Sequence, residues 1–147
     1  MNSTQPALVG DTENINRYIF SSSHYNQNRA KWPAFKPYQS EVSVMRVQGL
    51  NYDQIKQIGI EFVGVGRGKP PKAWVEFKAL EVRVLEYPDK KKLSLDVIPE
   101  TTHHNRHANI KDLSKQNYED WVEEAKILAE KIPMTLFEIP ETTPSES

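Results

Sequence analysis

The stretch AWVEFKALEVRVLEY, residues 73–87, decides whether the middle of this chain is helix or sheet. An apolar residue occupies every second position in two runs. The first run is Ala73, Val75 and Phe77, and the second is Leu80, Val82 and Val84. A period of two residues is typical of strands, whereas a helix repeats every 3.6 residues. The stretch therefore predicts two strands, or one long bent strand, instead of a helix.

The residues that follow predict a hairpin. Residues 88–92 (PDKKK) are typical of a solvated turn, and residues 93–98 (LSLDVI) would return along residues 80–87 as the second strand. Three other short runs of alternating or β-branched residues also predict strands, and these are residues 41–47 (EVSVMRV), residues 60–65 (IEFVGV) and, at a sheet edge, residues 134–139 (MTLFEI).

Two shorter segments favour helix. Residues 52–58 follow Asn51, a good N-cap residue, and precede Gly59, which we expect to end the helix. Residues 15–20 (INRYIF) are compatible with a helical turn or a strand, and we favour the helical turn.

The clearest helix lies near the C-terminus. Its apolar residues fall on a single stripe: Trp121, Ala125, Leu128 and Ile132. We expect Asn117 or Ser114 to cap its beginning and Pro133 to end it. Strands mixed with few helices predict an α+β fold, a single domain with a mostly antiparallel sheet and this C-terminal amphipathic helix.

Length and composition set limits on domain number and chemistry. The 147 residues include 19 basic and 20 acidic side chains, for a formal net charge of −1, and no cysteine. We expect a disordered leader over residues 1–14, a single domain over residues 15–139 and a disordered acidic tail over residues 140–147. The missing cysteine excludes a disulfide scaffold and a thiol nucleophile. No apolar run is long enough for a membrane helix, so we expect a cytoplasmic protein without a membrane partner.

The segment from Arg17 to Pro37 is basic and contains no acidic residue. It includes the run Ser21-Ser22-Ser23-His24, whose hydroxyls and imidazole either contact a phosphate or form turns and caps. Aromatic residues are interleaved with its bases: Tyr18, Phe20, Tyr25, Trp32, Phe35 and, just beyond it, Tyr38. Such rings stack on single-stranded nucleic acid or fasten a long loop to the core. We favour the second role for Phe20, Trp32 and Phe35.

Residues 101–110 (TTHHNRHANI) hold three of the four histidines. Histidine is a common acid or base near neutral pH, and Arg106 and Asn109 could orient an anion. The alternative is a polar loop in which His107 and Asn109 hydrogen-bond to the backbone. A metal site would need a helix to bring His103 and His107 together, and the composition argues against one, so we predict no metal.

The glycine cluster Gly64-Val65-Gly66-Arg67-Gly68-Lys69 lacks the features of a nucleotide-binding loop. A dinucleotide loop needs a differently spaced third glycine and a following helix, and a phosphate loop needs Ser or Thr after its lysine. Pro70 and Pro71 follow instead. We therefore predict a flexible connection at residues 64–71.

Several blocks of this chain together resemble an uncharacterised bacterial protein family. They are residues 21–24 (SSSH), Lys36-Pro37, residues 43–47 (SVMRV) with Gly49-Leu50, and residues 106–110 (RHANI). The resemblance extends from Arg17 to Leu113, although Lys111-Asp112-Leu113 stands where the family continues with Gly-Trp-Pro. It implies no activity, but it implies that the two polar blocks belong to one site.

These observations lead to one functional hypothesis and one alternative. We predict metal-independent recognition or cleavage of a phosphodiester or nucleotide, without a cofactor, in which His24 and His107 face each other across a cleft and exchange protons. The expected ligand-binding residues are Ser22, Arg29, Arg46, Arg106 and Asn109. Arg46 is included because its strand is otherwise apolar, and a buried arginine needs an anionic partner. The alternative is a non-catalytic module of a bacterial assembly that binds nucleic acid or a protein.

Overall fold

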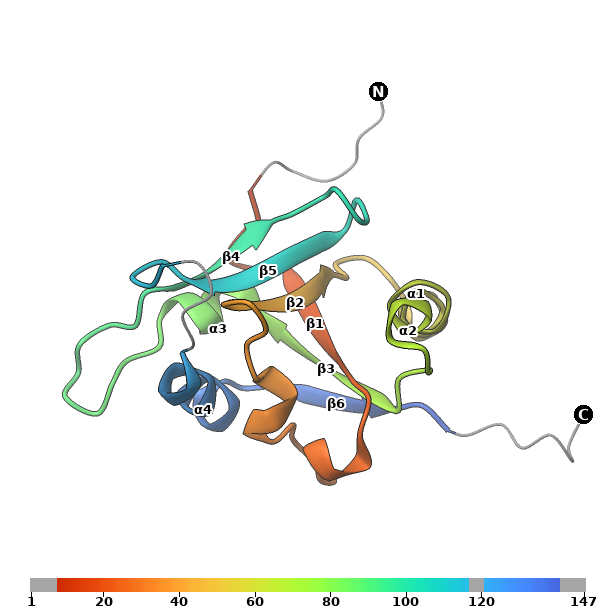
Figure 1. Ribbon diagram of the computed structural model, residues 1–147, viewed down its shortest axis with the longest axis horizontal. Coiled ribbons are helices and arrows are strands. Elements are labelled where there is room, and N and C mark those ends of the chain that lie inside the picture. Colours follow the sequence, from red (N-terminus) through yellow and green to blue (C-terminus); the bar gives the residue numbers. More distant parts are fainter. Residues whose placement is uncertain (1–7, 117–120, 141–147) are drawn as a thin grey trace, which may run out of the picture.

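The computed structural model describes residues 8–116 and 121–140. Its centre is a six-stranded sheet in the order β4-β5-β2-β1-β3-β6, and every neighbouring pair is antiparallel (Figure 1). The strands are β1 (Asn14–Ile19), β2 (Glu41–Arg46), β3 (Ala73–Lys78), β4 (Leu95–Pro99), β5 (His107–Asp112) and β6 (Thr135–Glu138). The fold is therefore α+β with an antiparallel sheet, as predicted.

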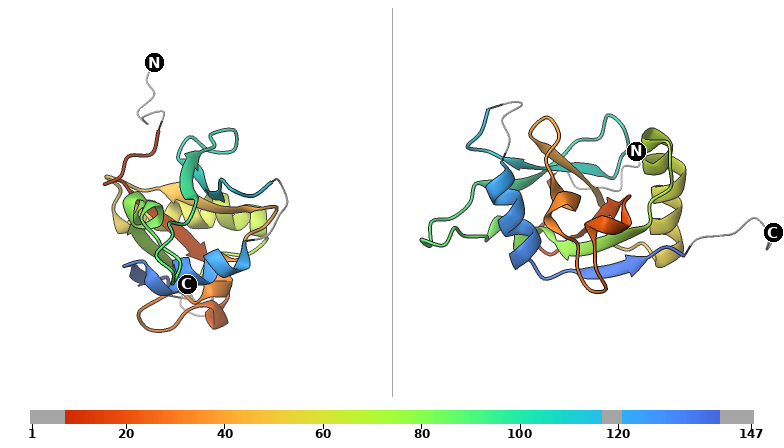
Figure 2. Two further views of the ribbon diagram at one scale, coloured as in Figure 1. Left: turned by 90° about the vertical axis from the view of Figure 1, so that its left-hand side faces the viewer. Right: turned by 60° about the horizontal axis from the view of Figure 1, so that its bottom comes forward.

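Helices cover both faces of this sheet. Tyr52–Ile58 (α1), the π-helix Gly59–Val63 (η3) and Gly64–Arg67 (α2) form one continuous helical segment, and the other helices are Ala79–Arg83 (α3) and Val122–Lys131 (α4). Two short 3₁₀ helices, Ser22–His24 (η1) and Trp32–Phe35 (η2), lie between β1 and β2 in the chain. In the right-hand view of Figure 2, α4 and the α1–α2 segment lie at opposite sides of the molecule, with strands between them.

Alternate residues of the strands belong to two separate hydrophobic clusters. Ile15 and Ile19 of β1 pack in the larger cluster with α4, whereas Tyr18 packs in the smaller one with Ile55 of α1. The Tyr18 hydroxyl also donates a hydrogen bond of 2.6 Å to the Ile55 carbonyl oxygen. The predicted helical turn at residues 15–20 is therefore wrong: both faces of this segment are buried, and it pairs with β3 along its whole length.

The stretch 73–87 begins as a strand and continues as a short helix, and its last four residues belong to neither. Residues 73–78 form β3 as predicted, but α3 begins at Ala79 and replaces the predicted second strand. Ala79 and Val82, three positions apart, are buried, while Leu80 and Val84 are 39% and 50% exposed. A helix buries residues at this spacing, and the apparent alternation of apolar residues concealed it. In place of the predicted hairpin, an isolated antiparallel β-bridge joins Glu86 and Lys92.

Two other segments differ from prediction because of tertiary contacts. The predicted strand at residues 60–65 is helical, since the helix continues through Gly59 as far as Arg67. Residues 64–67 are therefore not a flexible connection, and Gly68 ends the helix with a φ of +77°. The histidine-rich stretch is not entirely loop either, because β5 begins at His107 and pairs with β4 and β2.

The remaining helix and strand predictions are largely confirmed. Asn51 caps α1 through a capping box with Gln54. Helix α4, strand β2 and the edge strand β6 occur at the predicted positions. Trp121 occupies the N-cap position of α4, so the predicted cap at Ser114 is wrong, and Asn117 lies outside the described residues.

The domain extends further toward the N-terminus than predicted. Val9 is buried in the larger cluster, the carbonyl oxygens of Leu8 and Val9 accept hydrogen bonds from arginines, and Asn14 begins β1. Residues 8–14 are therefore part of the domain instead of a disordered leader. The predicted leader up to residue 7 and the tail from residue 141 lie outside the described residues.

Gly59 offers a test of how the helical segment is held against the sheet. A Cβ atom at Gly59 would lie 2.6 Å from Cε1 of Tyr18, whose hydroxyl is fixed by Ile55. We expect Gly59→Ala to lower the free energy of unfolding by about 1–3 kcal/mol because of this overpacking.

The matched control is Gly66→Ala, also within the helical segment. A Cβ at Gly66 would meet no atom within 4 Å. We expect this variant to raise the free energy of unfolding by about 0.5–1 kcal/mol, because alanine restricts the unfolded chain. Chemical denaturation of both variants measures the difference, and equal stabilities would contradict the close packing of Gly59.

Candidate anion-binding site

The site is formed where β1 and β2 separate. These strands pair only at Ile15 with Arg46 and Asn16 with Met45, and then run apart toward the segment that holds η1 and η2 (Figure 1). The Arg17 side chain occupies this split. Its Nε donates to the Ala34 carbonyl oxygen and its Nη1 to the Ser43 carbonyl oxygen, each at 2.8 Å. The guanidinium therefore bonds a β2 carbonyl that the β1 backbone no longer reaches.

Around Arg17 lies a cavity of about 660 Å³ that we call the basic cavity. Its lining includes five basic or imidazole side chains, which are Arg17, His24, Lys36, Arg67 and Lys69. The acidic residue in its lining is Glu41, which already accepts a hydrogen bond from Asn109 at 3.1 Å and has the Lys111 ammonium at 3.4 Å. The cavity therefore has a clear excess of positive charge.

Burial and the neighbouring positive charges lower the pKa of two of these side chains. Burial, together with the charge of Arg67, lowers the pKa of Arg17 to about 10, so Arg17 still carries its charge near neutral pH. Burial also lowers the pKa of His24, and the charges of Lys69 and Arg17 lower it further. Within residues 8–116 and 121–140, none of the five basic-cavity side chains forms an ion pair. An anion in the cavity would relieve this mutual repulsion.

A second cavity of about 460 Å³ adjoins the first, and we call it the apolar cavity. Its apolar lining comes from β2 and from the helical segment: Val44, Met45, Phe62, Val63 and Val65. The two cavities share five lining residues, which are Arg17, Tyr18, Phe20, Ser43 and Arg67. The Arg67 guanidinium lies 4.6 Å from the centre of the Phe20 ring, so a charged and an aromatic group meet at this shared wall.

The two predicted catalytic histidines belong to different parts of this hollow. His24 lines the basic cavity, and His107 lines the apolar cavity. His107 is only 8% exposed and has hydrogen-bond partners at both ring nitrogens. Ser22, two residues before His24 in η1, does not line either cavity, whereas Ser21 lines the basic one.

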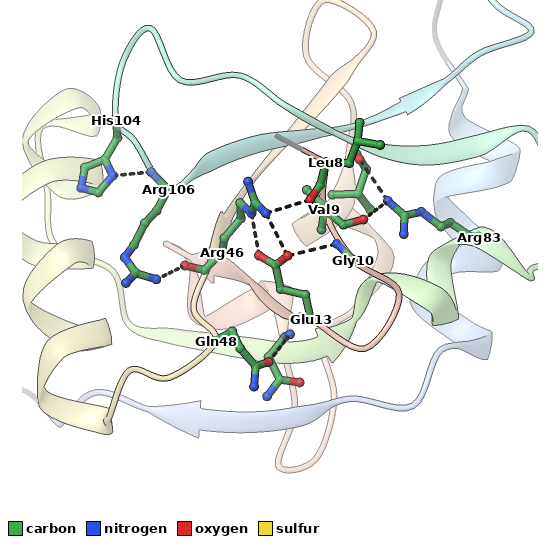
Figure 3. Close-up of polar contacts among 11 residues, drawn as sticks. Leu8, Val9, Gly10, Glu13, Arg46, Gln48, Arg83, His104 and Arg106 are labelled. Carbon is green, nitrogen blue, oxygen red and sulfur yellow. Dashed lines mark hydrogen bonds and ion pairs between the residues drawn. The ribbon is translucent and has the colours of Figure 1, made fainter. Parts of the chain in front are cut away.

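The structure does not bring Arg29 or Arg46 into these cavities. Arg29 donates to the carbonyl oxygens of Ala129 and Ile132, at 2.7 and 2.8 Å, and so caps the C-terminal end of α4. Arg46 is 1% exposed and forms a two-point ion pair with Glu13, at 2.5 and 2.9 Å (Figure 3). Sequence reasoning expected an anionic partner for Arg46, and Glu13 supplies it from within the domain.

Arg106 and Asn109 also make contacts within the protein. The Arg106 Nη1 donates to the Arg46 carbonyl oxygen at 2.9 Å, and its backbone amide donates to Nδ1 of His104 (Figure 3). Asn109 lies opposite Ser43 in the β2–β5 ladder and is 4% exposed. Neither residue lines the two cavities.

The aromatic residues of the basic segment separate into two groups. Phe20 and Phe35 are 6% and 0% exposed and pack in the core, and Trp32 packs against it, which confirms the fastening role predicted for them. Tyr38 is 77% exposed and lines the basic cavity. It is therefore the aromatic ring of this segment that is most available to a ligand.

Sequence reasoning missed four residues of the site, and the first is Arg17, which only marked the beginning of the basic segment. Arg67 and Lys69 belong to the glycine cluster, whose spacing does not fit a nucleotide-binding loop, and the sequence around Ser43 indicates only a strand. The usable signal was the charge of Arg67 and Lys69, since no acidic residue lies between Glu61 and Glu76. These two side chains lie near the segment 17–37 because the helical segment that ends at Arg67 packs against the sheet.

Comparison of the chain with protein-family models, with curated proteins and with solved structures finds no match. In the described part of the chain, no helix is long and apolar enough to span a membrane. Over the same residues, no three His, Asp or Glu side chains cluster closely enough to hold a metal ion. The two cavities are therefore the features of this protein that indicate a function.

Proposed function

We propose that this protein binds a phosphate-bearing ligand of the nucleotide or phosphodiester class in the basic cavity. The observation that carries the proposal is the gathering of Arg17, Arg67 and Lys69, without ion-pair partners among the described residues, around one hollow. Phosphate oxygens accept charge-assisted hydrogen bonds from such groups, and arginine matches their geometry especially well. These three residues come from β1 and from the end of the helical segment.

The adjoining apolar cavity supports a ligand with a second, uncharged part. Both cavities have volumes within the range that is usual for small-molecule sites, roughly 300–1,000 Å³. Phe62 lines the apolar cavity and is 37% exposed, so its ring is accessible for stacking. A nucleotide has this division into a charged phosphate and a flat, weakly polar base.

We propose recognition rather than cleavage by a His24–His107 pair. Both ring nitrogens of His107 are engaged within the protein, and the two histidines line different cavities. Proton exchange across one phosphodiester needs both imidazoles at the reacting atoms. His24 would instead donate or accept a hydrogen bond at the phosphate.

Single-stranded nucleic acid is a second candidate ligand, and Tyr38 favours it. This ring is exposed at the basic cavity, close in sequence to Lys36. Stacking on an aromatic ring beside basic residues is the common mode of binding single strands. A bound oligonucleotide would use the same cavity for one of its phosphates.

The double variant Arg67→Ala/Lys69→Ala tests the proposal. We expect it to weaken binding of ATP, or of a short single-stranded RNA, by at least about tenfold, because two phosphate contacts are lost. Isothermal titration calorimetry at several salt concentrations measures this. The salt dependence should also decrease, by about 0.7 in the logarithmic slope per lost contact for a single strand.

The control is Lys91→Ala/Lys92→Ala, which removes the same charge from an exposed turn. We expect it to bind like the wild type. An equal loss of affinity in both double variants would mean that overall charge determines binding, and it would contradict a defined site. Failure of the wild-type protein to bind inorganic phosphate, ATP and RNA would overturn the proposed function.

A further inference from the structure

A hydrogen-bonded row of three side chains crosses from β2 to the loop before β5. Oγ of Ser43 lies 3.1 Å from Nε2 of His107, and Nδ1 of His107 lies 3.1 Å from Oε1 of Glu100. The same Nδ1 is 2.8 Å from the Glu100 carbonyl oxygen. Serine, imidazole and carboxylate in this order form the arrangement that activates a hydroxyl as a nucleophile.

The surroundings of His107 determine its tautomer. Nδ1 faces two oxygens of Glu100, a carbonyl and a carboxylate, which only accept hydrogen bonds when the carboxylate is ionised. The proton of a neutral ring is therefore on Nδ1, and Nε2 has a free lone pair directed at Ser43. The hydroxyl of Ser43 then donates to Nε2, which is the polarity that proton removal from the hydroxyl requires.

The carboxylate of Glu100 is held in its ionised form. The hydroxyl of Thr102 donates to Oε2 of Glu100, and this bond, together with His107, lowers the pKa of Glu100 despite partial burial. Asn109 also approaches the hydroxyl of Ser43, with its Oδ1 at 3.4 Å. That contact is longer than the 3.1 Å to His107, so the imidazole is the better acceptor.

Ser43 also lies where a substrate could reach it. Its side chain is exposed although its strand neighbours Val42 and Val44 are buried, and it lines both the basic and the apolar cavity. Arg17 is fixed next to it, with Nη1 at 2.8 Å from the Ser43 carbonyl oxygen. A guanidinium in this position can stabilise an oxyanion that forms beside the serine.

We propose that Ser43, His107 and Glu100 hydrolyse a carboxylic ester that joins an apolar acyl group to a phosphate-bearing alcohol. The proposal deepens the proposed function and rests on it for the phosphate, which the basic cavity would hold. The acyl group would occupy the apolar cavity. The scissile carbonyl would then lie at Ser43, where the two cavities meet.

The reaction needs only the ester and water. His107 Nε2 takes the proton of the Ser43 hydroxyl as Oγ bonds to the carbonyl carbon, and the resulting oxyanion lies near Arg17. The bond from this carbon to the alcohol oxygen breaks, and His107 returns its proton to that oxygen. A water molecule then adds to the acyl-serine, with His107 again taking and returning one proton, and releases the carboxylic acid and Ser43. Glu100 acts as a positioning residue for the imidazole.

The first test is covalent labelling of the full chain with a neutral alkyl fluorophosphonate, followed by peptide mass spectrometry. We expect modification at Ser43, and loss of modification in Ser43→Ala and in His107→Gln. The matched control is Ser94→Ala, which removes another exposed hydroxyl and should leave labelling unchanged. Absence of labelling at Ser43 in folded protein would overturn the proposal.

The second test measures hydrolysis of p-nitrophenyl butyrate over a range of pH. We expect Ser43→Ala and His107→Gln each to lower the rate by about 10²–10⁴-fold. Glu100→Gln should lower kcat by less and leave KM unchanged, because Glu100 orients the imidazole without touching the substrate. A kcat equal to that of the wild type in Glu100→Gln would contradict the positioning role.

A third arm separates this proposal from the proposed function. Inorganic phosphate should slow labelling of Ser43 in the wild type, but not in Arg67→Ala/Lys69→Ala. Phosphate binding without any labelling of Ser43 would overturn the hydrolase and leave the binding site intact. Labelling of Ser43 without phosphate binding would overturn the phosphate-bearing substrate and the proposed function together.

Discussion

Replacing Glu13 with alanine is expected to lower the free energy of unfolding by about 3–5 kcal/mol. Glu13 is the two-point partner of Arg46, whose side chain is 1% exposed (Figure 3). Removing the carboxylate takes this two-point negative partner away from a buried guanidinium. Chemical denaturation at neutral pH measures the loss.

Two comparisons isolate the charge effect in this prediction. Glu13→Gln keeps the shape of the side chain and an oxygen acceptor, so we expect a smaller loss than for alanine. Glu86→Gln removes a carboxylate from an exposed position and should change stability by less than about 0.5 kcal/mol. A similarly small effect of Glu13→Ala would contradict a structural role for the pair.

The pH dependence of stability gives an independent measurement of Glu13. Burial alone would raise the pKa of its carboxyl group, but hydrogen bonds from Arg46 and the Gly10 amide, with the charges of Arg46 and Arg106, lower the pKa below its ordinary value. A group with a lowered folded-state pKa stabilises the fold above its unfolded pKa, about 4.3 for glutamate, and loses this contribution as pH falls through the folded value. The stability difference between wild type and Glu13→Gln should therefore be constant from about pH 7 to 5 and decrease below about pH 4.

Replacing Arg17 with methionine is expected to affect both stability and binding. The variant leaves the Ala34 and Ser43 carbonyl oxygens without their charged donor. Hydrogen bonds from charged groups contribute about 1.5–3 kcal/mol each, so we expect a loss of at least about 2 kcal/mol in the free energy of unfolding. Binding of ATP should decrease by more than tenfold, because a central cation of the basic cavity is lost.

Arg17→Lys is the informative companion variant. Lysine keeps the charge, but its single ammonium lacks the planar fork that reaches two carbonyl oxygens in fixed directions. We expect much of the stability loss to remain and part of the ATP affinity to return. Denaturation and calorimetry on both variants give the two quantities. Unchanged ATP affinity in Arg17→Met would remove Arg17 from the site.

The contrast between Arg17 and Arg46 shows how much of the site the sequence could predict. Both arginines lie on strands, and sequence reasoning selected Arg46 as a ligand-binding residue because a buried arginine needs an anion. The physical argument was sound, but Glu13, thirty-three residues earlier, supplies that anion. Arg17 instead bonds neutral carbonyl oxygens and keeps its charge available to the cavity. Only the placement of residues 8–14 distinguishes the two cases.

His107 gives a related example. The sequence indicated a histidine with possible acid–base chemistry, and the expected partner was His24. The ladder between β2 and β5 instead places His107 opposite Met45 and two residues away from the Ser43–Asn109 pair. Side chains two residues apart on paired strands share a face, so Ser43 becomes its neighbour. This pairing joins segments more than sixty residues apart, and no local pattern encodes it.

The sequence by itself determined the elements whose local signals agree with their environment. Asn51 capped a helix, the stripe from Trp121 to Ile132 formed another, and the β-branched run at residues 41–47 formed a strand. In these segments periodicity, capping and burial all favour one structure. The α+β class followed from them.

Tertiary structure alone decided the segments in which burial opposed the local signal. Residues 15–20 became a strand because both of their faces are covered, and residues 79–83 became a helix because Ala79 and Val82 face the core. It also decided the site, since the cavities exist only where β1 and β2 separate and the helical segment brings Arg67 beside Arg17. Long-range packing sets these positions, because the free energy of burying apolar surface on both faces of a sheet outweighs local helix or strand preference.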